Sequence, residues 1–126
     1  MPRHDRTGRH YREAADFPEA DATLTGLGTA AVHAAGAKAA FDLEGAEAIS
    51  MRQVITAVGA TPTMTLNLEA SVDGSNWVQL GTWGAKTATG NDERAFPTLG
   101  YSQARFNVIA NTNVTFRIDR LRFIRP

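Results

Sequence analysis

Apolar and polar residues alternate most regularly between residues 63 and 83. From Met64 to Ala70 every second residue is apolar, and the residues between them are polar. A period of two places the apolar side chains on one face of a β-strand. The turn-forming residues Asp73 to Asn76 follow, and a second extended stretch runs from Trp77 to Trp83. The pattern therefore predicts a β-hairpin with one apolar face.

Further strands are predicted on both sides of this hairpin. Residues 37–43 alternate, residues 48–58 are rich in β-branched side chains, and residues 104–110 and 114–123 form two closing strands. Residues 95–98 are expected to form an edge strand, because Pro97 cannot donate to a central ladder.

The apolar parity changes in two of these strands, near Arg52–Gln53 and at Asp119–Arg120. A strand whose apolar face switches sides can keep its register only with an extra residue. We therefore predict a β-bulge at each point.

The remaining segments are interpreted as short pieces, turns and one loop. Residues 23–25 are β-prone, residues 59–62 and 111–113 are turn formers, and residues 84–94 are small and polar, which is typical of an exposed loop. The count is six to eight strands at intervals of about ten residues. This spacing predicts an all-β fold, a single antiparallel β-sandwich or jelly roll.

The first 21 residues differ from the rest of the chain, because they are charged and nearly free of large apolar groups. Such a segment cannot bury enough surface to offset the entropy lost on ordering. We predict a flexible, extended or disordered arm at residues 1–21 and one β-sandwich domain at residues 22–126. Three interpretations of the arm stay open: a floppy terminus, an arm that orders on a neighbouring subunit, and a nucleic-acid-binding tail.

Arginines at the two ends of the chain suggest contacts between subunits. Those of the last strand could form a solvated polar face, or pair with carboxylates of a neighbouring arm such as Glu13, Asp16 or Glu19. The candidate subunit contacts are Arg3, Arg6, Arg9, Arg12, Glu13, Asp16, Arg117, Arg120 and Arg122.

The bulk composition excludes several classes of function. The formal net charge is zero, which argues against a general polyanion binder, and the chain has no cysteine. Disulfides, thiolate zinc sites and cysteine nucleophiles are therefore excluded. No apolar run approaches the roughly 18 residues that a membrane span needs. The N-terminus lacks the apolar core of a secretory signal, so folding in the cytoplasm is expected.

The sequence contains no recognisable catalytic constellation. Its histidines, His4, His10 and His33, have no second ligand beside them, and nucleotide, hydrolase and metalloprotease motifs are missing. We expect no enzyme activity, no cofactor and no metal. Residues 73–76 carry oxygen ligands like those of a calcium loop but lack its later glutamate, so they are interpreted as a turn. Trp77 and Trp83 are interpreted as core residues, with an exposed sugar-stacking platform as the alternative.

The segment Leu66–Trp77 (LNLEASVDGSNW) resembles hairpins of two protein groups. One group is the discoidin-type jelly-roll domains, which implies carbohydrate or lipid binding through loops at one end. The other is the small β-sandwich structural proteins of tailed bacteriophages. That resemblance implies a cysteine-free virion protein with a charged terminus. It covers about 20 residues, with a looser likeness over residues 104–123, and it is specific for fold more than for function.

Among the phage proteins, the capsid decoration or cement type fits this chain best. This resemblance implies a non-enzymatic protein on the outer head lattice of the virion, synthesised in the host cytoplasm. The expected partners are the major capsid protein and further copies of the chain, for example in a trimer. Nucleic acid, membrane and small-molecule substrates are not expected. The alternatives are a tail or baseplate component and a carbohydrate-binding β-sandwich module.

Overall fold

The computed structural model describes residues 3–4, 10–11 and 16–126. Its regular structure is almost entirely β, which confirms the predicted all-β fold. Two short strands near the N-terminus pair with each other, and the other six strands form one antiparallel sheet. The elements are β1 (Arg3–His4), β2 (His10–Tyr11), the 3₁₀ helix η2 (Ala22–Thr25), β3 (Gly36–Ala37), β4 (Phe41–Asp42), β5 (Ala48–Ser71), β6 (Val78–Lys86), β7 (Gly90–Pro97) and β8 (Gln103–Ile124).

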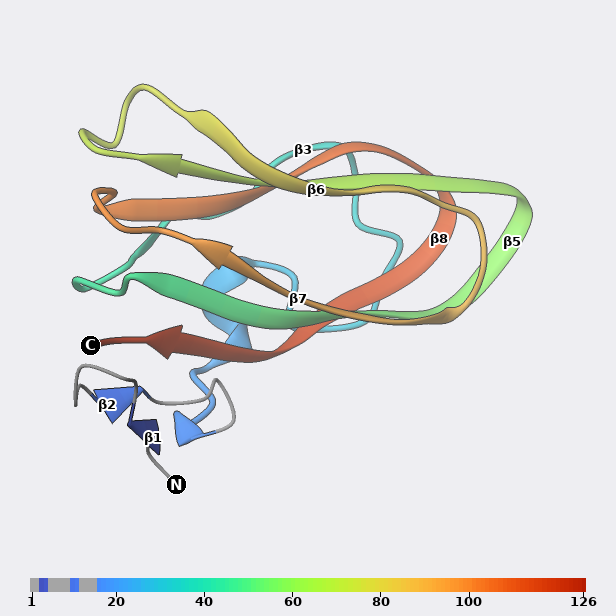
Figure 1. Ribbon diagram of the computed structural model, residues 1–126. Coiled ribbons are helices and arrows are strands. Elements are labelled where there is room, and N and C mark those ends of the chain that lie inside the picture. Colours follow the sequence, from blue (N-terminus) through green and yellow to red (C-terminus); the bar gives the residue numbers. More distant parts are fainter. Residues whose placement is uncertain (1–2, 5–9, 12–15) are drawn as a thin grey trace.

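The sheet is organised around β5 and β8, which pair with each other on both sides of a shared bend (Figure 1). One layer contains the pairs from Ala48–Ile124 to Val58–Val114, and the other contains those from residues 63 and 112 to residues 71 and 103. Because both strands bend at the same place, the sheet folds over onto itself as a sandwich. A jelly roll has eight strands in two Greek keys, and the main sheet of the described chain has six.

The bend corrects two predictions. Residues 59–62 and 111–113 were expected to be turns between separate strands. The chain does double back at both places (Figure 1), but each lies inside one long strand. Thr61 and Asn113 have φ angles of 48° and 56° there. The side chain of Asn113 donates to the carbonyl of Ala60 over 2.6 Å, so the two bends are also joined to each other. Turn-forming residues thus change the direction of both strands, and the pairing between the strands is interrupted only at the bend and resumes beyond it.

Strands β6 and β7 extend the two layers at opposite ends of β5. The predicted hairpin is confirmed, since β6 pairs with β5 from Met64–Lys86 to Ala70–Val78. Strand β7 pairs with the first half of β5 and forms the edge of the other layer. The loop predicted at residues 84–94 is wrong, because β6 and β7 leave only residues 87–89 between them.

The free edge of β8 is covered by the chain segment that precedes β5. Ala20 donates to the carbonyl of Leu121, Ile118 to that of Leu27, and Lys38 to that of Phe106. The segment thus runs antiparallel along β8 through both layers. The predicted strand at 23–25 is wrong, because η2 occupies it and Asp21 caps this helix by accepting from the Thr23 amide. The strand predicted at 37–43 is interrupted and survives only as β3 and β4.

One of the two predicted bulges is confirmed and the other lies elsewhere. Arg120 has a φ of 54° and is the extra residue of β8 opposite Met51, so Ile118 and Leu121 are both buried. The pairing of β5 with β7 is unbroken through Arg52 and Gln53. The register between β5 and β8 shifts beside Arg52, where Arg120 is the extra residue of β8, and an extra residue of β5 lies farther along, between residues 55 and 57. The apparent change of apolar parity near Arg52–Gln53 does not come from a bulge in β5. It arises because one buried position of β5 is occupied by a polar residue, Gln53.

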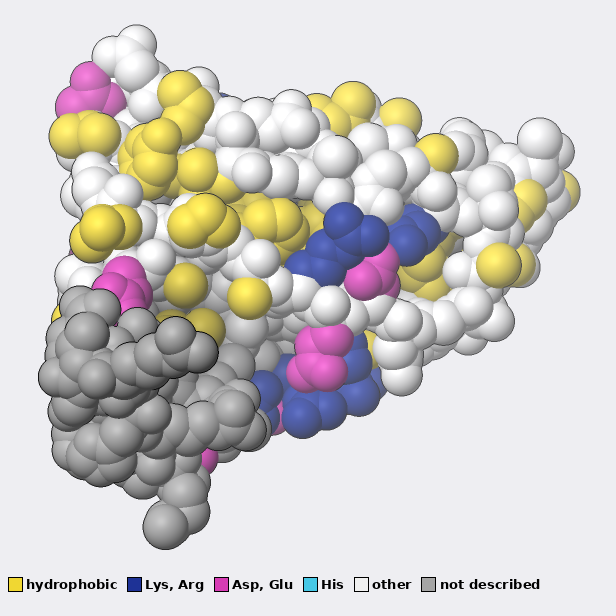
Figure 2. Space-filling model, viewed as in Figure 1, with side chains coloured by type: hydrophobic (Ala, Val, Ile, Leu, Met, Phe, Trp, Pro, Cys, Tyr) yellow, Lys and Arg dark blue, Asp and Glu magenta, His cyan; other side chains and the backbone are white. Residues whose placement is uncertain are grey.

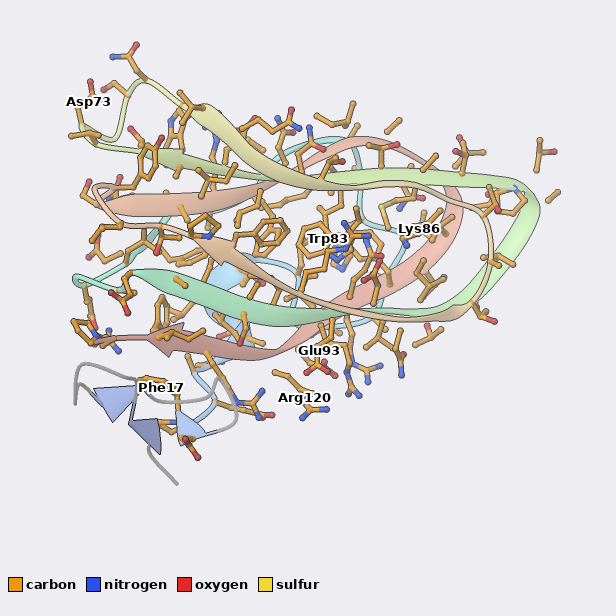
Figure 3. All side chains as sticks on the ribbon, in the orientation of Figure 1. Phe17, Asp73, Trp83, Lys86, Glu93 and Arg120 are labelled. Atoms are coloured by element: carbon orange, nitrogen blue, oxygen red, sulfur yellow. The ribbon has the colours of Figure 1, made fainter. Side chains whose placement is uncertain are left out.

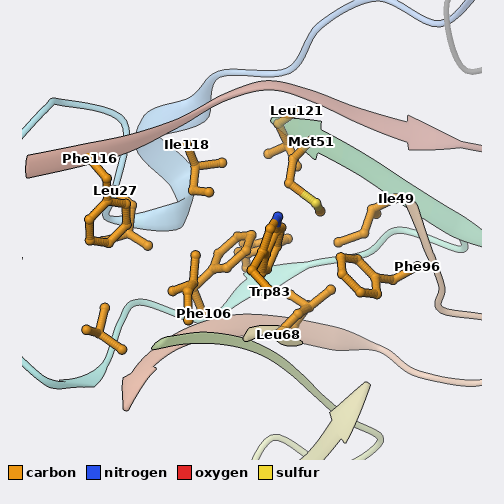
Figure 4. Packing of buried hydrophobic residues seen from close by; sticks show 14 of the residues in the cluster. Leu27, Ile49, Met51, Leu68, Trp83, Phe96, Phe106, Phe116, Ile118 and Leu121 are labelled. Carbon is orange, nitrogen blue, oxygen red and sulfur yellow. The ribbon is translucent and has the colours of Figure 1, made fainter. Parts of the chain in front are cut away.

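The core lies between the two layers and contains apolar side chains from both (Figure 4). Trp83 of β6 lies at its centre, with ring centroids 5.2 Å from Phe96 of β7 and 5.9 Å from Phe106 of β8. Trp83 is therefore a core residue, as predicted. No helix among the described residues is long and apolar enough to cross a membrane.

Candidate functional site

The structure joins the two ends of the chain through arginine–carboxylate pairs. Glu19 lies 3.2 Å from Arg122 and 3.7 Å from Arg120, and Arg120 lies 3.4 Å from Glu93 of β7 (Figure 3). Arg122 also donates to the carbonyl of Phe17. The predicted pairing of N-terminal carboxylates with C-terminal arginines is thus present through Glu19, but within one chain. Pairing with a neighbouring subunit stays a prediction.

Arg117 belongs to a second ion-pair group, on the strands themselves. Arg52 of β5 holds Asp119 through two parallel hydrogen bonds of 2.8 and 2.9 Å, and Arg117 reaches the same carboxylate over 3.2 Å. The hydrogen bond from Arg52 is the main reason why the pKa of Asp119 lies below its ordinary value. This group fixes β5 against β8 beside the Arg120 bulge, so its geometry indicates a structural role.

The other predicted contact residues lie at or before the start of the described fold. Asp16 is partly buried, and Arg3 lies in β1. Arg6, Arg9, Arg12 and Glu13 lie outside the described residues, as does most of the predicted arm. Packing against the sandwich begins before residue 22, because Phe17 is buried. A single phenylalanine among charged residues had given no sequence signal of this.

The turn at residues 73–76 is organised by Asp73. Its carboxylate accepts hydrogen bonds from the amides of Asn76 and Ser75 and from the side chains of Asn76 and Ser71. These bonds, led by that of the Asn76 amide, hold the pKa of Asp73 far below its usual range. The geometry is that of a self-contained turn. In the described part of the chain, no group of three potential metal ligands comes together.

The tryptophans offer little stacking surface. Trp83 is buried, and the guanidinium of Arg105 lies 4.2 Å from the ring centroid of Trp77 and covers one of its faces. Arg105 is itself held by Glu69 over 2.8 Å. A sugar would have to displace this arginine to use that face of Trp77.

Several titratable side chains of the described residues are engaged in structural contacts. The ring of His33 bonds to the carbonyl of Thr29 over 2.8 Å and packs edge-on against Phe116. Arg94 and Lys86 both bind Asp92, and the hydrogen bond from Arg94 is the main cause of its lowered pKa. Every carboxylate pKa that departs from its ordinary value in this part of the chain is lowered. Such carboxylates are poor general acids or bases near neutral pH.

The end of the sandwich at which the strands bend has a different surface, which we call the neutral end. It is formed by residues 29–35, 56–63, 87–91 and 109–113, which contain no lysine, arginine, aspartate or glutamate. Figure 2 shows this end, on the right, without charged side chains. Val32, Val58 and Ile109 are exposed there. Asn111 ties the segments together by donating to the carbonyl of His33. Sequence reading had missed this surface, because its segments are far apart in the chain.

Fold and surface thus define a small β-sandwich protein whose described charged groups hold its strands together. Among solved structures, the fold is similar to that of the SPBc2 prophage-derived protein YomS. The TM-score is 0.53 at 13% sequence identity, over 75% of this chain and 88% of that chain. At this identity the likeness concerns the fold. No protein family matches the chain, and neither does any curated protein sequence.

Proposed function

We propose that this protein is a structural component of a bacteriophage virion that acts by binding other proteins and has no catalytic role. The resemblance of the 66–77 hairpin to phage virion proteins supports a phage origin, as does the shared fold with a prophage-derived protein. In its specific form, the proposal is a capsid decoration protein on the outer head lattice. Its partners would be the major capsid protein and further copies of this chain.

The observation that carries the proposal is the neutral end. The cores of protein–protein interfaces are depleted of charged residues, because burying an unpaired charge is costly. Four segments from distant parts of this chain, none of which contains lysine, arginine, aspartate or glutamate, together form a surface with exposed Val32, Val58 and Ile109. A surface of this kind loses little solvation energy when it is covered by another protein.

The mechanism would be physical. Each copy would contribute a modest contact, and many copies on one lattice would add their contacts through multivalency. A rigid fold suits this role, because it enters the contact with little further loss of conformational entropy. The long β5–β8 pairing in both layers and the ion pair between Arg52 and Asp119 across it supply that rigidity.

The test is the composition of the particle. Virions would be purified from the phage or induced prophage that encodes this chain, and the copy number measured by quantitative mass spectrometry against the major capsid protein. A decoration protein should be present in a fixed ratio and in many copies, and labelled antibody should bind intact heads. A few copies with label on the tail would replace the head assignment with a tail assignment. Absence from particles would overturn the proposal.

A further inference from the structure

A cavity of about 610 Å³ lies where the N-terminal segment meets β4 and the end of β8. One part of its lining is aromatic, formed by Phe17, Phe41 and Phe123, and Leu24 of η2 also lines it. The rings of Phe41 and Phe123 stand edge to face with their centroids 6.2 Å apart. A cavity of this size is within the range that holds a small ligand or a few side chains of a peptide.

The rim of this cavity is acidic. Glu19, Asp42 and Glu44 line it, and Arg125 is the basic residue among the described lining residues. Three carboxylates against one guanidinium give the described lining residues a net charge of −2. Arg125 pairs with Glu44 over 3.2 Å, and its guanidinium lies 5.4 Å from the ring centroid of Phe123. The aromatic wall therefore already carries one guanidinium, which is the geometry of a cation–π contact.

This chemistry suits an arginine-bearing peptide with an aromatic residue. Residues 1–12 of the chain have that composition, with four arginines, one aspartate and Tyr11, a net charge of +3 when the histidines are neutral. We propose that the cavity binds residues 1–12 of a second copy of the chain. Arginines of that segment would pair with the rim carboxylates, and Tyr11 or an arginine would cover the aromatic wall.

The choice of a second copy rests on the proposed function, in which copies lie side by side. It also extends the observed pairing of the two chain ends. Glu19 is already shared between Arg120 and Arg122 of its own chain. The carboxylates with the most room for a further cation are Asp42, which accepts from Gln103 over 3.3 Å, and the exposed Glu44.

Two single-cysteine proteins test the proposal, because the natural chain has no cysteine. One carries Thr7→Cys in the basic segment and the other Leu24→Cys in the cavity, and the two are mixed at low salt under mild oxidation. With the two proteins in equal amounts, we expect a 7–24 heterodimer, resolved by mass, in excess over the two homodimers together, which is the share that random pairing would give. Replacing Leu24→Cys with Ser75→Cys, in the turn at 73–76 and outside the cavity lining, should abolish that excess.

Charge variants test whether the rim carboxylates bind the basic segment. Combining Asp42→Asn and Glu44→Gln in the Leu24→Cys protein should lower the heterodimer yield about fivefold, since two exposed ion pairs are removed. Glu47→Gln, in the same loop but outside the cavity lining, is the matched control and should leave the yield unchanged. Thermal unfolding of each variant confirms that it is folded. An unchanged heterodimer yield after substitution of Asp42 and Glu44 would overturn the proposed recognition of the basic segment by the rim.

A chain carrying both Thr7→Cys and Leu24→Cys distinguishes docking within one chain from docking between two copies. An internal disulfide in a monomer, without heterodimers in the mixing experiment, would show docking within one chain and overturn the second copy. No disulfide in either experiment would overturn the cavity as the acceptor. Either failure leaves the particle measurement unaffected, so a protein abundant in virions without a 7–24 heterodimer would keep the proposed function and lose only this inference.

Discussion

Phe96 of β7 lies directly against Gly81 of β6, so close that a methyl group on Gly81 would overlap the phenylalanine ring. The two strands belong to different layers, and each takes its backbone pairing from β5. The open side of the sandwich is therefore closed by side chains. Phe96 and Trp83 fill it, and Arg94 reaches across from β7 to the carbonyl of Thr82 over 3.0 Å.

Gly81→Ala should destabilise the fold by about 1–3 kcal/mol, the usual cost of overpacking a core. The backbone at Gly81 has an ordinary φ, so the cost comes from the overlap with Phe96. Urea unfolding at neutral pH measures it. Adding Phe96→Leu to Gly81→Ala should cost less than the sum of the two single changes, because the smaller side chain relieves the overlap. Strictly additive effects would show that the two residues do not interact.

Asp119→Asn should lower the free energy of unfolding at pH 7 by about 1.5–3 kcal/mol, the usual worth of hydrogen bonds to a charged group. The substitution removes the charge that Arg52 and Arg117 share. Glu47→Gln, a carboxylate exposed in the loop before β5, is the control and should change stability by less than about 0.5 kcal/mol.

The ion pair between Arg52 and Asp119 also predicts how acid affects the stability of the protein. The pKa of Asp119 is lowered by folding, so its contribution is complete above the unfolded value of about 3.9 and disappears as the pH falls through the lower, folded pKa. The stability difference between the natural chain and Asp119→Asn should therefore shrink below about pH 4. Denaturant titrations at pH 7 and pH 3 measure it. A difference of equal size at both values would contradict the ion-pair explanation.

The hairpin and the Arg120 bulge could be predicted from the sequence because both depend on local parity. Alternation from Met64 to Ala70 determines one buried face, and burial of both Ile118 and Leu121 requires one extra residue between them. The bends at Thr61 and Asn113 were misread for a physical reason. Glycine, proline and asparagine indicate that the chain changes direction, but only the paired strand decides whether the ladder continues through the change.

The candidate surfaces were harder to predict. Opposite charges at the two ends of the chain led us to predict pairing with a neighbouring subunit, whereas the structure shows Glu19 paired with Arg122 of its own chain. Charge alone does not distinguish these two kinds of partner. The neutral end has no local pattern at all, because its residues come together only when β5 and β8 bend. Gln53 illustrates the opposite case, a polar residue in a buried position that no sequence pattern would assign to the core.

Gln53→Met should raise the free energy of unfolding by about 1 kcal/mol, within the range that a buried unpaired polar group costs. Gln53 is 1% exposed, and both polar atoms of its amide lack a hydrogen-bond partner. Methionine has a similar shape and no such requirement. Gln79→Met, at an exposed position of β6, is the control and should give no gain. A lower melting temperature for Gln53→Met would indicate that the amide has a partner such as a bound water.

A charge placed on the neutral end should prevent assembly without unfolding the protein. Ile109 is 49% exposed in β8, so Ile109→Glu buries no charge in the isolated chain and should change its stability by less than about 0.5 kcal/mol. In an interface, the carboxylate would be buried without a partner, at a cost of several kcal/mol. Particles that lack the natural protein would be mixed with each variant and sedimented, and the bound fraction measured.

Leu99→Glu is the matched control for this experiment, since Leu99 is 76% exposed and lies outside the neutral end, in the connection between β7 and β8. It adds the same charge, so a general effect of charge on binding would affect both variants alike. We expect Leu99→Glu to sediment with particles like the natural chain, and Ile109→Glu to remain in solution. Equal binding of the two variants would exclude the neutral end as the contact surface. Loss of binding in Leu99→Glu alone would assign the contact to the opposite, loop-bearing end of the sandwich.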